Sequence, residues 1–590
     1  MDSLAPTKKS WILLLITLVI FVFGISMAQL IDTQGGKVNV QDTYFTSSRD
    51  GSLLHGRLYT PTNATAKTPA PAFIFYHGND GDCDKYSMFG VELSRRGYVA
   101  FICDMRGQGQ SVGSVAKGDA NDTYGAVEAT EYLRSMSFVD SSNITISGHS
   151  LGGLCAAWAY AVRPEYYKGL VFIGIKTADF NKAIPTETKV NVFLSTGRDD
   201  GDSVNHTTAA AYFGNCTPEE FIPGKVYGSF EDNTARENYQ AMDAIHNTEY
   251  INKQTLRHIL DFVQGVSRAP TPIDGNSQVW LFRFLSTSLA YFALIFMLLP
   301  LGSILLNTPF FGAICRTPPE YKGNTKMRWW FFAILTVVVA PLTYFHLTST
   351  AGKWMPIKVF SVQRATLTLG WALIIAVFTI AVLVIGYFLT RKEKRPSLVN
   401  YGLTYEKGQN FVNIAKSLLL SFIMVFAIYS LLEVTYRWTL IDVRIWNSSL
   451  RVISSVRIGR ILTYYIPFAF AYVVLAVNLH GTLRPKSGNI SIIREILLNI
   501  VLIAPWYYVW AIWFGPFSWL QAHGAVPSFG GMMYSFFWAV PIIMAVIATV
   551  STYFFRKTGR VWLGAFISAW LISWALLGGF SMMLGALPPK

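Results

Sequence analysis

The stretch Gly148-His149-Ser150-Leu151-Gly152-Gly153 decides the fold of the first half of the chain. It follows a β-branched run at residues 143–147, which predicts a strand, and it precedes an alanine-rich run at residues 154–161, which predicts a helix. A G-x-S-x-G pattern between a strand and a helix is typical of a strained elbow, whose glycines let the two elements pass close together. The stretch therefore predicts that Ser150 is a nucleophile. A glycine-rich turn that only joins a strand to a helix is the alternative.

The composition indicates a chain that is partly embedded in a membrane. Of its 590 residues, 52% are hydrophobic and 14% are charged, a balance that is wrong for a soluble enzyme of this length. Residues 32–275 have an ordinary globular composition, whereas residues 276–590 alternate long apolar runs with short polar loops. We therefore expect three parts: an N-terminal segment at 1–31, a globular domain at 32–275 and an all-helical membrane domain at 276–590.

The N-terminal segment predicts a membrane anchor. Lys8 and Lys9 precede an uncharged apolar run at residues 11–28, which is about the length that crosses a bilayer. A cleaved signal peptide is the alternative, since residues 26–28 resemble a cleavage site. We favour a retained signal anchor with both lysines in the cytoplasm, and either interpretation exports the globular domain.

Eight further apolar runs predict transmembrane helices. They lie at residues 284–306, 329–345, 367–389, 418–432, 462–477, 496–513, 532–552 and 561–584. If the globular domain is extracytoplasmic, three cytoplasmic loops are strongly basic, as the positive-inside rule requires. Much of the net charge of +14 therefore lies beside the membrane, and membrane lipids are the expected partner rather than nucleic acid.

Residues 437–460 do not fit this orientation, because several arginines fall in a loop assigned to the outside. Apolar residues are interleaved with them, so we expect an amphipathic helix on the outer membrane surface or under the hydrolase domain. A wrong span count is the alternative. Ionisable residues are scarce inside the predicted spans, which argues against an ion-coupled transporter.

The globular domain alternates predicted strands with predicted helices. The strands are expected at residues 38–46, 53–59, 72–76, 98–103, 143–147, 169–174 and 190–195, and the helices at 86–96, 121–135, 154–161 and 253–263. Such alternation predicts a mostly parallel sheet with helices on both faces.

Four motifs resemble those of the α/β-hydrolases, in the branch that contains the monoacylglycerol lipases and serine aminopeptidases. In chain order they are His77-Gly78, the D-x-R-G-x-G-x-S run at 104–111, the elbow at 148–153 and a G-x-x-D set at 197–200. The resemblance covers roughly residues 38–266 and implies an α/β-hydrolase fold that forms an acyl-enzyme. It implies nothing about the membrane domain.

A serine hydroxyl needs a base, and the base needs an orienting carboxylate. The resemblance implies the chain order serine, acid, histidine. Asp200 fits the acid because it ends the loop after the strand at 190–195, although Asp199 and Asp202 are close enough to replace it. His246 fits the base because it precedes the last helix of the domain.

The other histidines fit the base less well. His258 is the rival to His246, but it lies within the predicted helix beside an arginine, where we expect it to be solvated. His206 follows the acid too closely, and the remaining candidates precede Ser150, namely His55, His77 and His149.

The resemblance also implies an oxyanion hole made by the backbone N–H groups of Asn79 and Leu151. Asp104 and Arg106 are expected to tie their loop together rather than to contact substrate. Members of the family usually insert a helical cap, but residues 175–189 are too short for one, so we expect little or no cap. The cleft is then open or roofed by the membrane domain, with residues 201–239 as another possible cover.

The sequence shows no cofactor motif and no metal-ligand spacing, so we expect neither a cofactor nor a metal. Cys83 and Cys216 could pair in an oxidising compartment. The pattern as a whole predicts a membrane-anchored serine hydrolase that cleaves ester, thioester or amide bonds of a small acyl or peptide substrate. Lipid substrates at the outer membrane face are favoured over exported peptides. A transporter-like membrane domain with an accessory or catalytically inactive hydrolase module is the other hypothesis.

Overall fold

The computed structural model describes residues 8–113, 123–175, 184, 188–198, 217, 220–321, 326–390, 392, 395–485, 490–509, 539–579 and 582–583. It divides into two compact units. The sheet unit contains Ser26–Ser286, Thr439–Ile441 and Phe580–Lys590. The helical unit contains Met1–Ile25, Thr287–Trp438 and Asp442–Gly579.

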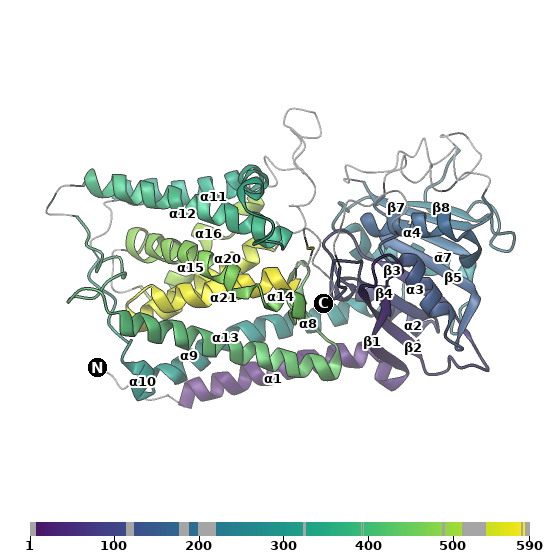
Figure 1. The fold of residues 1–590 in the computed structure, drawn as a ribbon, viewed down its shortest axis with the longest axis horizontal. Coiled ribbons are helices and arrows are strands. Elements are labelled where there is room, and N and C mark those ends of the chain that lie inside the picture. The colour runs from purple at the N-terminus through teal and green to yellow at the C-terminus, as the bar shows by residue number, and fades with distance from the viewer. Residues whose placement is uncertain are drawn as a thin grey trace. The chain divides into compact units, whose positions relative to one another are not determined.

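The sheet unit is built on one eight-stranded sheet (Figure 1). Its order is β1-β2-β4-β3-β5-β6-β7-β8. β2 pairs antiparallel with β1 and β4, and every other neighbouring pair is parallel. The strands are β1 (Val38–Thr46), β2 (Leu53–Pro61), β3 (Ala70–Tyr76), β4 (Val99–Cys103), β5 (Val139–His149), β6 (Gly169–Ile173), β7 (Asn191–Gly197) and β8 (Arg236–Ala241).

Helices cover both faces of this sheet because its central strands are apolar on both faces. In β3, Phe73 and Phe75 belong to a core with α2 (Ser87–Arg95) and α7 (Lys253–Val266), whereas Ile74 and Tyr76 belong to a core with α3 (Ala126–Arg134) and α4 (Leu151–Val162). This alternation follows from the two-residue period of a strand. The predicted α/β-hydrolase architecture, mostly parallel and covered on both faces, is confirmed.

The sheet unit also holds a strand and several short turns that the sequence pattern did not predict. β8 is missing from the prediction, because its sequence Arg-Glu-Asn-Tyr-Gln-Ala is polar and lies at the edge of the sheet. The 3₁₀ turns are η1 (Gln34–Gly36), η2 (Cys83–Tyr86), η3 (Pro164–Tyr166) and η5 (Glu249–Ile251). The predicted lack of a cap concerns segments that lie mostly outside the described residues.

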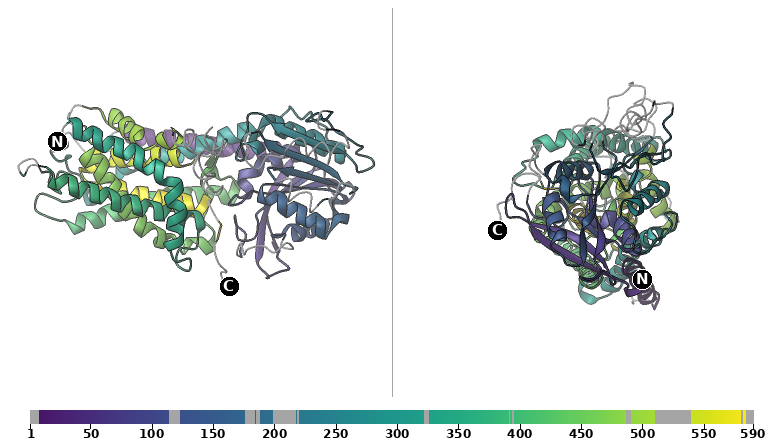
Figure 2. Two further views of the ribbon diagram at one scale, coloured as in Figure 1. Left: turned by 90° about the horizontal axis from the view of Figure 1, so that it is seen from above. Right: turned by 90° about the vertical axis from the view of Figure 1, so that its right-hand side faces the viewer.

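Among the described residues, nine helices are long and apolar enough to cross a membrane. The chain therefore has the features of a multi-pass membrane protein. The helices concerned are α1 (Lys8–Asp32), α8 (Trp280–Phe296) continued by α9 (Leu298–Leu306), α11 (Lys326–Trp354), α12 (Gln363–Phe388), α13 (Phe411–Thr439), α15 (Ile461–Val477), α16 (Ile492–Ile503), α20 (Val540–Thr558) and α21 (Trp562–Gly579). Within the helical unit, the long helices lie side by side (Figure 2), with α15 packed against α21 and α16 against α20. The shorter α10 (Pro309–Gly312) follows α9.

The amphipathic helix expected at 437–460 is wrong. After α13 the chain forms a short hairpin, β9 (Val443–Ile445) and β10 (Ser448–Leu450), and then the four-residue α14 (Ser455–Ile458). Arg444 and Arg451 are buried beside the fully buried carboxylate of Asp442, and the Arg451 carbonyl accepts a hydrogen bond from Trp574 Nε1 at 2.7 Å. Because Asp442 balances the charge of Arg444 and Arg451 inside the protein, these two arginines are not exposed at a membrane surface.

Buried polar groups also join three elements of the helical unit. His480, in the π-helical turn η7 (Asn478–Thr482) after α15, is hydrogen-bonded to Ser551 of α20 at 2.8 Å. Glu495 of α16 is buried and pairs with Arg556 of α20 at 3.2 Å. The ionisable groups among these lie outside the spans predicted at 462–477, 496–513 and 532–552, but inside the observed candidate spans Ile461–Thr482, Ile492–Val509 and Val540–Thr558.

Candidate active site

Ser150 lies on a strained turn between β5 and α4. Its φ of 53° and ψ of −122° are rare for a residue with a side chain. A Cβ atom on Gly148 would overlap the backbone of Gly152, and one on Gly152 would overlap the carbonyl oxygen of Tyr76. The turn therefore requires both glycines, which explains the G-x-S-x-G spacing.

His246 lies beside Ser150, although 96 positions separate them in the chain. Its Nε2 atom is 2.9 Å from Ser150 Oγ, in a turn between β8 and η5. The imidazole side chain is 30% exposed, so solvent can reach it. An imidazole at this distance can take the hydroxyl proton, as the sequence prediction requires.

Asp200 lies outside the described residues, as do the alternatives Asp199 and Asp202. The described residue before them is Arg198, whose N–H donates to the Ala241 carbonyl at 2.8 Å. Arg198, the described residue that follows β7, is therefore hydrogen-bonded to the end of β8.

A second carboxylate, absent from the sequence prediction, lies next to His246. Glu249 is fully buried at the start of η5, and its Oε1 atom is 3.5 Å from His246 Nδ1. Its Oε2 atom accepts a hydrogen bond from the backbone N–H of Gly197 at 2.6 Å. A signal was present in the sequence, because a residue three positions after a histidine in a tight turn can reach the same imidazole.

His149 is more than a spacer in the elbow. Burial, followed by the nearby His246, lowers the pKa of His149 well below its ordinary value, so its ring is neutral. Its Nδ1 accepts a hydrogen bond from the Tyr86 hydroxyl at 2.8 Å, and its Nε2–H faces the His246 carbonyl at 2.9 Å. The Tyr86 hydroxyl in turn accepts the backbone N–H of Gly78 at 3.2 Å.

The predicted oxyanion residues lie in well-fixed backbone. Asn79 follows His77-Gly78, and His77 Nε2 accepts a hydrogen bond from Met105 N–H at 3.1 Å. Burial lowers the pKa of His77, which keeps the ring neutral and able to accept this bond. Leu151 is the first residue of α4, so its N–H lies at a helix N-terminus, where negative charge is favoured.

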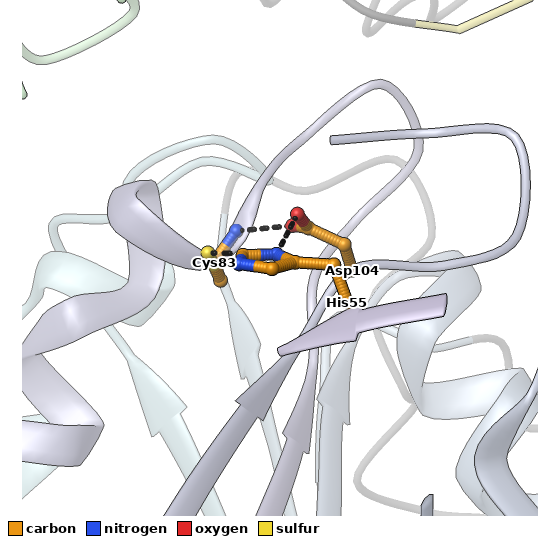
Figure 3. A group of neighbouring side chains, drawn as sticks. All are labelled: His55, Cys83 and Asp104. Carbon is orange, nitrogen blue, oxygen red and sulfur yellow. Dashed lines mark hydrogen bonds and ion pairs between the residues drawn. The ribbon is translucent and has the colours of Figure 1, made fainter. Parts of the chain in front are cut away.

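The D-x-R-G-x-G-x-S loop is organised by Asp104 (Figure 3). Its carboxylate accepts the backbone N–H groups of Cys83 and Gln110 at 2.7 Å each, and it binds His55 Nδ1 at 2.7 Å. His55 Nε2 also lies 3.2 Å from Asp42, and hydrogen bonds to the two carboxylates outweigh burial and raise the pKa of His55 to about 9. This geometry supports the expectation that Asp104 holds the loop together. Cys83 is buried beside this group, and Cys216 lies outside the described residues, so their pairing stays a prediction.

His55, Cys83 and Asp104 together offer three atoms that could bind a metal ion. The Asp104 oxygens, however, already receive backbone and imidazole donors, and the protonated ring of His55 has no lone pair for a metal. The donor set therefore fits a hydrogen-bonded network better than a metal centre.

The rival base, His258, is engaged elsewhere. Its Nδ1 atom lies 2.6 Å from a carboxylate oxygen of Glu237, and its ring stacks on Tyr239 with centroids 4.2 Å apart. The expectation that His258 is solvated is wrong, because β8 supplies both partners and leaves its side chain 14% exposed.

Comparisons with known proteins point to the same domain. A family model described as serine aminopeptidase, S33, matches residues 67–190. The uncharacterized protein YfhR of Salmonella typhi is 30% identical over 108 residues, and the protein of that name from Salmonella typhimurium is 29% identical over 108 residues. The aligned region is 18% of this chain and 36% of each relative, so the chain spans about a third of their length.

Solved structures that align with the chain include hydrolases. The esterase Est22 has a TM-score of 0.29 and 16% identity, and the alignment covers 42% of this chain and 83% of the Est22 chain. The acylaminoacyl peptidase of Pyrococcus horikoshii has a TM-score of 0.29 and 14% identity, and the alignment covers 42% of this chain and 45% of the peptidase chain. With the strand order described above, the chain contains a serine aminopeptidase S33-type α/β-hydrolase domain, together with many long apolar helices that indicate a membrane domain.

Proposed function

We propose that the protein is a membrane-anchored serine hydrolase that works through an acyl-enzyme. The observation that carries this proposal is the 2.9 Å distance between Ser150 Oγ and His246 Nε2, with the serine on a strained turn at the N-terminus of α4. The family model that matches residues 67–190 supports the same class of chemistry.

In this proposal, Ser150 Oγ attacks the acyl carbon of the substrate and its proton passes to His246 Nε2. The N–H groups of Asn79 and Leu151 stabilise the oxygen that becomes negative, and Asp200 orients the imidazole. His246 then gives the proton to the leaving group, which leaves the acyl group esterified to Ser150. Water, deprotonated by the same imidazole, releases the acid and restores the serine.

Lipid esters or other acylated molecules at the outer membrane face are the proposed substrates. In this proposal, the nine long apolar helices found among the described residues keep the catalytic unit at a bilayer, where lipid substrates are concentrated. Lys8 and Lys9 at the start of α1 favour a cytoplasmic N-terminus and an extracytoplasmic hydrolase domain. Peptides are the second substrate class, and the serine aminopeptidase family model supports it.

The test is labelling of the full-length protein in native membranes with a fluorophosphonate probe. Ser150→Ala is expected to abolish the label, and Ser147→Ala, which alters a neighbouring hydroxyl on β5, is expected to retain it. An unlabelled wild-type protein would refute the proposal. A panel of lipid esters, thioesters and aminoacyl amides then separates the substrate classes.

Transport by the helical unit is a second candidate function, and one observation favours it. The buried residues His480 and Glu495 lie at the helix packing of η7, α16 and α20, where ionisable groups are uncommon without a role. Flux across proteoliposomes that is lost in Glu495→Gln would support this candidate, and the absence of any flux in the wild type would remove it.

A further inference from the structure

The carboxylate of Glu249 lies between two imidazoles. Its Oε1 atom is 3.1 Å from His149 Nε2 and 3.5 Å from His246 Nδ1. Nδ1 is the ring atom opposite the one that faces Ser150, and this is the atom through which a carboxylate orients a catalytic histidine. Glu249 therefore lies on the Nδ1 side of the His246 ring, where a carboxylate can fix the tautomer of the ring and stabilise its positive charge.

A fully buried carboxylate is costly unless charges or hydrogen bonds compensate it. The Gly197 N–H supplies one hydrogen bond, at 2.6 Å. Of the two imidazoles beside Glu249, His149 stays neutral because its pKa is strongly lowered. The positive charge that Glu249 can balance is therefore the one that forms on His246 when it takes the serine proton.

The absence of a side chain at Gly174 leaves room for the Glu249 carboxylate. Gly174, at the end of β6, has a φ of 63°, and a Cβ atom on it would overlap Glu249 Oε1 and lie 3.1 Å from His246 Cε1. A side chain at this position would push the carboxylate away from the imidazole. The glycine thus makes room for the Glu249–His246 contact.

Among the described residues, the titratable groups around the two imidazoles come from β5, η5, η2 and the turn after β3. They are His149 on β5, Glu249 and Tyr250 on η5, Lys85 and Tyr86 on η2, and His77 in the turn. Burial raises the pKa of Tyr86 well above its ordinary value, so its hydroxyl remains a donor. Glu249 is the acidic group among these described residues.

We propose that Glu249 is a positioning residue for the hydrolase reaction, which holds His246 toward Ser150 and stabilises its protonated form. The proposal rests on the proposed hydrolase function. Glu249 also fixes Gly197, three residues before Asp200, so one buried carboxylate holds both the base and the start of the acid loop. This role of Glu249 does not depend on where the Asp200 side chain lies.

The test measures the rate of fluorophosphonate labelling against pH for the full-length protein in detergent. Glu249→Gln removes the charge and keeps the shape. Labelling is expected to slow about 10-fold. In the plot of labelling rate against pH, the acidic limb (the fall in rate at low pH) is expected to lie about one pH unit lower, because the imidazolium loses its counter-charge. Glu249→Asp keeps a carboxylate and is expected to retain the wild-type acidic limb.

Glu237→Gln is the matched control, because Glu237 is another buried carboxylate paired with a histidine, His258, in the same unit. It is expected to leave both the rate and the acidic limb unchanged. A Glu249→Gln protein with the wild-type rate and limb would overturn this inference while leaving the hydrolase proposal intact. If Glu249→Gln does not fold, Gly174→Ala serves as the second variant, with the same slower rate and shifted limb expected. Failure of the wild type to label at any pH would instead refute the hydrolase function itself.

Discussion

At the scale of single residues, the elbow glycines are fixed by what lies next to them. Gly152 faces the Tyr76 carbonyl oxygen too closely for any Cβ atom. We therefore predict that Gly152→Ala destabilises the protein by more than about 4 kcal/mol or prevents its accumulation. The measurement is the thermal unfolding midpoint of the detergent-solubilised chain, together with its yield.

Gly459→Ala is the control for this prediction. Gly459 has ordinary helical backbone angles, and a Cβ atom there would meet nothing within 4 Å. It is expected to unfold at the wild-type temperature. If Gly152→Ala matched it, the close approach of strand and helix at the elbow would be wrong.

His55 makes stability depend on pH. Its pKa in the folded chain is about 9, raised from 6.5 by Asp104 and Asp42. Because the folded-state pKa is the higher one, the stabilisation is fully present below about pH 6.5 and is lost as the pH rises through about 9. The difference amounts to about 3 kcal/mol for this fully buried ring. We predict that the unfolding midpoint falls between pH 6.5 and 9.5, and that His55→Gln is less stable and loses this dependence. A wild-type midpoint that is flat over this range would contradict the ion-pair network.

The sequence alone predicted Ser150 and His246 as partners, since the elbow spacing and the chain order limit the choices, and the structure places their side chains 2.9 Å apart. It missed Glu249, because its burial depends on a tertiary approach of η5 to the end of β6. It placed His149 in the elbow but could not predict its contacts, because the hydrogen bonds to Tyr86 and to the His246 carbonyl join segments far apart in the chain.

At the scale of elements, burial determined which strands could be predicted. β3 and β4 are buried at every position, so their continuous apolar runs were recognisable. β8 is polar and lies at the edge of the sheet beside β7, so no pattern in its own sequence separates it from a loop. The same limitation affected residues 437–460. Their arginines resemble those of an amphipathic helix at a membrane surface, because the sequence does not show that the hairpin of β9 and β10 brings Asp442 beside Arg444 and Arg451.

That hairpin gives a prediction about the helical unit. Asp442→Ala removes a buried carboxylate beside Arg444 and Arg451, which leaves buried guanidinium groups with less compensation. We predict a loss of about 3 kcal/mol, seen as a lower unfolding midpoint in detergent. Glu433→Gln is the control, because its partner Arg437 is 73% exposed and such surface pairs contribute little. Equal midpoints for the two variants would show that Asp442 has no structural role.

At the scale of the whole molecule, Met582 and Met583, which follow α21 in the chain, belong to the sheet unit. The Met582 N–H donates to the Asp80 carboxylate at 3.0 Å, and the Met583 N–H donates to the Gly107 carbonyl at 3.2 Å. Asp80 directly follows Asn79 and has a φ of 59°, so this contact holds a strained residue beside the proposed oxyanion hole.

We predict that Met582→Pro, which removes the donor N–H, slows fluorophosphonate labelling several-fold. Met582→Ala keeps the N–H and is expected to label at nearly the wild-type rate. Equal rates for the two variants would show that the backbone contact to Asp80 does not support the site.

The central claim is that His246 makes the Ser150 hydroxyl reactive. The direct measurement is mass-spectrometric mapping of the residue that a fluorophosphonate modifies in the purified full-length protein, compared with His246→Ala. We predict one adduct, on Ser150 in the wild type, and a strong loss of that adduct in the variant. An adduct on another residue, or equal modification of Ser150 without His246, would contradict it.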